Sequence, residues 1–118
     1  MGRVRAVRGA ICVPGNSRAS ILDATERLLA AILERNALDA RGLVSIVFTA
    51  TPDLDAAFPA EAARRMGMGA VPLLCAQEIA VPGAMARVVR VLVHAETERE
   101  ALAPAYLDGA EALRDDLS

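Results

Sequence analysis

Two arginines and one glutamate stand where charged side chains are uncommon, inside or directly after runs of apolar residues. Arg8 and Arg90 each interrupt an apolar stretch, and Glu78 follows another. A charge in such a stretch needs a partner of opposite sign or a polar cavity to face. Taken singly, each fits a salt bridge or a solvated strand face better than a binding site. Together with Arg114, they suit a small ligand that carries several negative charges and a hydroxyl group.

Sequence patterns for nucleophilic or metal-dependent catalysis do not occur. There is no nucleophile elbow, no glycine-rich phosphate loop and no cluster of metal ligands. The single histidine, His94, lies inside an apolar run, so we expect it to be structural. Cys12 and Cys75 are too few for a disulfide framework or a four-cysteine metal site. Cys75 ends an apolar run and is interpreted as a small apolar filler, so we predict no metal site.

Composition indicates one compact domain that associates with copies of itself. The chain has 118 residues, of which 54% are hydrophobic, and its mean hydropathy of +0.34 excludes intrinsic disorder. We expect a single domain over residues 1–118. Only 3% of the residues are aromatic, and much of the apolar content is alanine. A core made largely of such small side chains gains stability when further surface is buried against a partner, so we expect an oligomer.

Charge and hydropathy patterning exclude two classes of partner. The net charge is −2 and the cationic residues are dispersed, which is unlike a protein that binds nucleic acid. No window approaches the roughly 18 consecutive apolar residues of a transmembrane helix. Residues 1–9 alternate arginine with small or apolar residues and lack the apolar core of a secretory signal. We therefore expect no nucleic-acid or membrane partner and a cytoplasmic location.

Apolar periodicity predicts the elements that must position these charged residues. Strands are expected over residues 3–13, 43–49, 71–75 and 87–95, and helices over residues 18–36 and 60–66. Ser17 or Ser20 is available to cap the longer helix. Residues 101–113 combine helix formers with the turn signal Asp108-Gly109, and we expect a short strand pair there. The fold class predicted is α/β (α+β), with a mixed sheet of about five strands, one long and one short helix, and a sheet face or edge covered by another subunit.

Two segments are the most specific of several that occur together: residues 49–54, Thr-Ala-Thr-Pro-Asp-Leu, and residues 75–78, Cys-Ala-Gln-Glu, which occur with the strand arginines. Together these segments resemble the monofunctional AroH class of chorismate mutase. The resemblance covers nearly the whole chain and implies a homotrimer whose sheets form a pseudo-α/β barrel, with sites between neighbours. The implied reaction is the intramolecular Claisen rearrangement of chorismate to prephenate, in phenylalanine and tyrosine biosynthesis. Such a reaction needs no metal or other cofactor.

The resemblance also implies a role for each candidate residue. Arg90 would meet the ether oxygen, on which negative charge builds as the C–O bond breaks. Arg8 and Tyr106 would hold the enolpyruvyl carboxylate, and Glu78 with the Cys75 backbone would bind the ring hydroxyl. The apolar walls would be Phe58, Ala60, Leu73, Leu74 and Leu113, with Arg64 and Arg114 toward the entrance.

Two departures from the family pattern and two alternative functions remain open. The family has lysine where this chain has Glu61, which implies weaker capture of a dianion, and threonine where it has Leu74. One alternative is a trimeric enamine or imine deaminase of the RidA type, which does not explain Glu78 placed with Arg90 and Tyr106. The other is a non-catalytic trimer that binds an aromatic-pathway metabolite. Turnover of chorismate separates all three.

Overall fold

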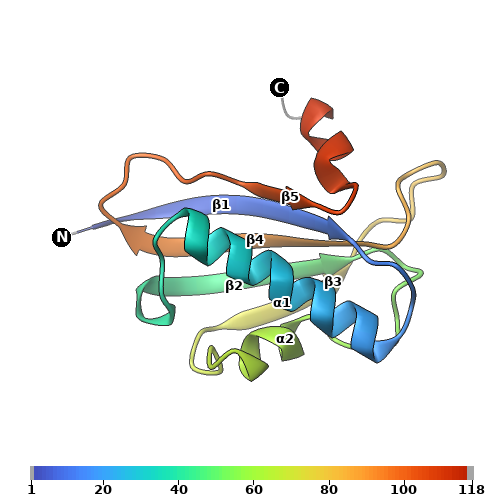
Figure 1. Cartoon of the computed structure of the whole chain (residues 1–118), viewed down its shortest axis with the longest axis horizontal. Helices are drawn as coiled ribbons and strands as arrows, with labels where there is room; N and C mark the ends of the chain where they lie inside the picture. The colour runs from blue at the N-terminus through green and yellow to red at the C-terminus, as the bar shows by residue number, and fades with distance from the viewer. Residues whose placement is uncertain (1, 117–118) are drawn as a thin grey trace.

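A single mixed sheet of five strands carries two α-helices on one of its faces in the computed structural model of the chain (Figure 1). The structure describes residues 2–116, with side chains as far as residue 113. The strands are β1 (Arg3–Cys12), β2 (Leu43–Ala50), β3 (Leu73–Gln77), β4 (Val88–Thr97) and β5 (Ala105–Leu107). The helices are α1 (Arg18–Arg35) and α2 (Ala60–Arg65), with 3-10 turns η1 (Ala40–Gly42) and η2 (Ala110–Asp116). The predicted α+β class, a mixed sheet of five strands with one long and one short helix, is confirmed.

The strand order is β3-β2-β4-β1-β5, so β4 is the central strand. It runs antiparallel to both neighbours, β1 and β2, whereas β3 and β5 lie parallel to β2 and β1 at the two edges. The pairing of β2 with β4 shifts by one residue between Leu43 and Ser45, which leaves a bulge at Val44. Beyond the bulge the register is regular to the end of β2.

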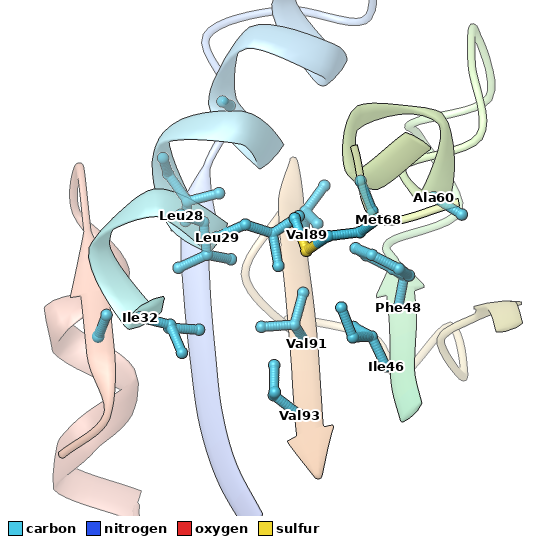
Figure 2. Close-up of a cluster of buried hydrophobic side chains, with 14 of the residues drawn as sticks. Leu28, Leu29, Ile32, Ile46, Phe48, Ala60, Met68, Val89, Val91 and Val93 are labelled. Carbon is cyan, nitrogen blue, oxygen red and sulfur yellow. The ribbon is translucent and has the colours of Figure 1, made fainter. Parts of the chain in front are cut away.

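The core lies between the sheet and the two helices. Side chains alternate across a strand, so β4 presents Val89, Val91 and Val93 to the helices (Figure 2). The apolar stripe of α1, which includes Leu28 and Ile32, packs on this face and is fully buried. The remaining side chains of β4 project onto the opposite face of the sheet, here called the open face.

The ends of α1 are fixed by side chains that replace missing backbone hydrogen bonds. Ser17 is the N-cap, and its hydroxyl accepts the N–H of Ser20 at 3.1 Å. At the other end, the buried Asn36 amide donates to the Ala103 carbonyl at 2.9 Å and accepts the Ala103 N–H at 2.7 Å. This pair ties the end of α1 to the segment that enters β5, and so fixes where β5 lies.

The strand pair expected over residues 101–113 is wrong. Only β5 is a strand there, and it pairs with β1 rather than with a neighbour in sequence. Asp108 and Gly109, with φ of 54° and 98°, form a turn that leads into η2 instead of a second strand. The reason is burial, because η2 places the fully buried Ala110 on the open face in a small cluster with Ala10 and Tyr106.

The other boundaries differ from those expected by one or two residues. The largest shift is at β3, which begins at Leu73 rather than at Val71, since Pro72 has no N–H to give the sheet. The strand β4 continues two residues further than expected, to Thr97. None of these shifts moves a candidate site residue to the other face of the sheet.

Candidate active site

One row of side chains crosses the open face of all five strands. Tyr106 of β5 pairs with Ala10 of β1, and Ala10 pairs with Arg90 of β4. Arg90 in turn pairs with Thr49 of β2, which pairs with Ala76 of β3. Paired residues in a sheet point to the same face, so Arg90 stands at the middle of this row with a small residue on one side and a hydroxyl on the other.

Glu78 joins this row from the end of β3. Its backbone N–H donates to the Ala50 carbonyl at 2.9 Å, which continues the pairing with β2 by one step. Its Oε2 atom lies 3.0 Å from Nε of Arg90 and accepts the Thr49 hydroxyl at 2.6 Å. The Glu78 side chain is 18% exposed and that of Arg90 44% exposed, so the guanidinium is held by the carboxylate while part of it still faces outward.

A hollow of about 80 Å³ opens beside Arg90 on the same face, and it is here called the arginine pocket. Its side walls are Arg8, Arg90, Tyr106 and Leu113. Arg8 makes no ion pair with a carboxylate whose side chain the structure describes. Sites for small molecules usually measure about 300–1,000 Å³, so this hollow holds only part of such a ligand. A second wall is needed to enclose the rest.

Glycine at position 9 lets α1 and β5 approach the strand that carries Arg8. A Cβ added at Gly9 would lie 2.7 Å from Cδ1 of Ile32 and 3.0 Å from the Ala105 carbonyl oxygen. The first distance is too short for a contact between carbon atoms, and the second is unusually tight and involves a backbone atom. The close approach brings Tyr106 and Leu113 within reach of Arg8, which explains the glycine next to that arginine.

The loop of residues 51–53 fixes the start of β4. The buried Thr51 hydroxyl accepts the Val88 N–H at 3.0 Å, and Asp53 Oδ2 accepts the Arg87 N–H at 2.9 Å. Arg87 has a φ of 52°, a conformation that such contacts must hold in place. A hydrogen bond from Thr51, helped by backbone N–H groups, keeps the pKa of Asp53 below its usual value despite some burial. The loop therefore sets the register from which Arg90 projects.

A second hollow, here called the edge pocket, lies beside β3 on the helix side of the sheet. It measures about 360 Å³, and its walls include Leu54, Phe58 and Cys75. Phe58 is 71% exposed, although it is one of the three aromatic residues of the chain. This aromatic side chain is therefore available to contact another molecule.

The remaining candidates fall around the edge pocket or outside it. Leu74 projects from β3 on the open face and is 63% exposed, whereas Leu73 packs against the core. Ala60 is buried at the start of α2. Arg64 lies on the exposed surface of α2. The side chain of Arg114 lies outside the described residues.

The candidates thus form two groups that one chain does not bring together. The arginine pocket and Glu78 are on the open face, whereas Phe58 and Cys75 line a hollow on the helix side of an edge strand. The first group offers two guanidinium groups, a phenol and a carboxylate, which suit a ligand with two carboxylates and a hydroxyl. No group of three or more metal-ligating side chains occurs among the described residues.

Comparison with known proteins agrees with this chemistry. A family model described as chorismate mutase type I matches residues 4–117, nearly the whole chain. The chain belongs to the type I chorismate mutase family. It is therefore an isomerase that converts chorismate to prephenate, and the predicted resemblance and function are confirmed.

Individual chorismate mutases are similar over almost their full length. One relative, chorismate mutase AroH of Thermus thermophilus, is 45% identical over 117 residues, which is 97% of this chain and 96% of the relative. Chorismate mutase AroH of Bacillus subtilis is 36% identical over 118 residues, 98% of this chain and 93% of the relative. A solved chorismate mutase from Clostridium thermocellum superposes with a TM-score of 0.90 at 42% identity, covering 92% of this chain and 98% of that one.

The histidine and the first cysteine of this chorismate mutase lie outside both pockets. His94 is four residues along β4 from Arg90, and its Nδ1 is 3.2 Å from the Ser45 hydroxyl. Cys12 Sγ lies 3.6 Å from the Met85 sulfur, and burial raises the pKa of its thiol, which disfavours a reactive thiolate.

Among the described residues, neither helix has the length and apolar character that a membrane span requires.

Sequence reasoning gave two residues of this chorismate mutase no role of their own. Thr49 opens the segment 49–54 that carries the resemblance, but only the fold pairs it with Arg90. Arg18 begins α1, yet it forms a two-pronged ion pair with Glu61 of α2, with Nη1 and Oε1 2.8 Å apart. Glu61, which the resemblance implies to be a departure from the family, is therefore paired with a cation from a segment distant in sequence.

Proposed function

We propose that the rearrangement takes place in a site shared by two protomers of a homotrimer. The arginine pocket of one protomer, with Glu78, would hold the polar groups of chorismate, and the edge pocket of its neighbour would enclose the ring. The observation that carries the proposal is the division of the candidates between two sides of the sheet, neither side being complete alone. Exposed Leu74 and Phe58 support it, because contact with a neighbour would bury both.

Electrostatic stabilisation supplies much of the rate in this proposal. The reaction is already intramolecular, so the gain from holding the reactive conformer is smaller than the gain from joining two reactants. As the C–O bond breaks, negative charge gathers on the ether oxygen. A cation fixed beside that oxygen binds the transition state more tightly than the substrate. Arg90 suits this role because the bond between its Nε and Glu78 leaves both terminal nitrogens for the ligand.

The other groups would select the compact conformer of the substrate. Arg8 and Tyr106, on the far side of the arginine pocket from Glu78, would hold the enolpyruvyl carboxylate. Glu78 and the Cys75 backbone would take the ring hydroxyl. Apolar walls would come from Phe58, Ala60, Leu73, Leu74 and Leu113, with Arg64 and Arg114 toward the entrance. No step requires a metal or other cofactor, because all the atoms that react belong to one molecule.

Activity should follow assembly as the protein is diluted. Because each proposed site draws on two chains, a separated protomer has no complete site, and binding of its neighbours also contributes stability. We expect the molecular mass from light scattering to equal three chains, and the loss of chorismate absorbance per chain to fall in step with the trimeric fraction. A monomer with full specific activity would contradict the proposal.

Removing Arg18 should weaken substrate capture without slowing the chemical step. In Arg18→Ala the Glu61 carboxylate stays unpaired three residues beyond Phe58, where it would repel an approaching dianion. We expect KM to rise about two- to five-fold with kcat unchanged, in line with the small energies of exposed ion pairs. The double variant Arg18→Ala with Glu61→Gln should restore KM, and Arg41→Ala, an exposed arginine on η1, serves as the control. A fall in kcat equal to the change in KM would show a different role for Arg18.

A further inference from the structure

The Thr49 hydroxyl and the Arg90 guanidinium share one oxygen of Glu78. Thr49 Oγ1 donates to Oε2 at 2.6 Å, and Arg90 Nε lies 3.0 Å from the same atom. The short distance from Thr49 is typical of a hydroxyl bound to an ionised carboxylate. No described residue donates to the second oxygen, Oε1, or accepts from the terminal nitrogens of Arg90. One oxygen of the carboxylate is thus used within the protein, and the other remains for a ligand.

We propose that Thr49 is a positioning residue for the rearrangement, and that it acts through Glu78 and not by touching the substrate. This inference rests on the proposed function of Arg90 and Glu78. By fixing Oε2, the hydroxyl sets the rotation of the carboxylate about its side chain. That rotation keeps Oε2 against Arg90 Nε and turns Oε1 toward the place of the ring hydroxyl. The Arg90 guanidinium and the Glu78 carboxylate would then both be oriented for the substrate before it binds.

The backbone makes Thr49 well placed for this task. It pairs directly with Arg90 across β2 and β4 and with Ala76 across β2 and β3, and it faces the same way as both. Glu78 enters from β3 with its N–H held by the neighbouring Ala50 carbonyl. Threonine is branched at Cβ and has few rotamers in a strand, so its hydroxyl is held in one direction. The carboxylate therefore has a rigid donor on one side and a cation on the other.

Isosteric and conservative substitutions of Thr49 test the inference. Thr49→Val keeps the shape and removes the donor, and we expect kcat to fall about 10- to 100-fold, as for loss of a hydrogen bond to a charged group. KM should change much less, because Glu78 orients Arg90, and the Arg90 guanidinium acts on the transition state. Thr49→Ser should retain most of kcat. Ser45→Ala, on the same strand and face beside His94, is the control and should match the wild type.

A double-mutant cycle separates positioning from a general structural role. If Thr49 acts through Glu78, Thr49→Val should lower kcat much less in a Glu78→Gln enzyme than in the wild type. Equal losses in both backgrounds, or a Thr49→Val enzyme with normal kcat, would overturn the inference. Normal turnover by Arg90→Ala would instead overturn the proposed function itself. An inactive Arg90→Ala beside a fully active Thr49→Val would remove only the role of Thr49.

Discussion

Replacing Arg90 by alanine should lower kcat by at least about 10²-fold, the usual loss when one donor to a developing oxyanion is removed. In the structure Arg90 is the central member of the row across the open face, and Glu78 holds its Nε atom. Its terminal nitrogens are therefore oriented before the substrate binds. Water that enters the space left by alanine would have to reorient as charge develops, so it cannot replace a fixed cation.

A lysine at this position distinguishes charge from geometry. Arg90→Lys keeps the positive charge but has no planar fork, so it cannot meet Glu78 and the ligand from different nitrogens at the same time. We expect kcat to stay well below that of the wild type. The measurement is the initial rate of chorismate loss, with thermal unfolding and molecular mass recorded for each variant. An Arg90→Ala enzyme that is trimeric, folded and nearly as fast as the wild type would refute the assignment.

Two inactive variants should restore activity when they assemble together. The first is Arg90→Ala, which damages the arginine pocket. The second is Phe58→Asp, which places a carboxylate in the edge pocket beside a dianionic substrate. If each site takes one pocket from each of two neighbouring chains, a mixed ring of three chains has one of its three sites with both pockets intact. Mixed trimers should therefore give about a third of the wild-type activity.

The two chains carry different affinity tags, so that only mixed trimers are purified and assayed. Each variant expressed alone provides the baseline. A double variant with both substitutions in the same chain, mixed with wild-type chains, provides a control for dilution. Mixed trimers that stay as inactive as either parent would show that both pockets serve a site within one chain, which would contradict the shared site.

The sequence was sufficient to predict the strand that carries Arg90, because alternation of apolar residues fixes which side chains share a face. It could not show that Thr49 stands opposite Arg90, because register depends on pairing between distant segments. The pairing of Glu61 with Arg18 could not be predicted for the same reason, since these residues are 43 positions apart in the sequence. Local patterns therefore predicted the charged groups, and only the fold shows which of them meet.

The segment after β4 shows why local turn signals do not always decide the fold. Asp108-Gly109 favours a tight turn in either a hairpin or a change from strand to helix. The choice depends on burial of Ala110 and on the pair between Asn36 and Ala103, neither of which is visible locally.

The bulge at Val44 indicates where residues can be inserted into the chain or deleted from it. It separates the first residue of β2 from the part of the strand that pairs in regular register up to Ala50. An insertion or deletion in the connection that precedes it could be taken up at this irregularity, leaving Thr49 across from Arg90. That connection is the natural place to graft a peptide or a second module while keeping turnover intact.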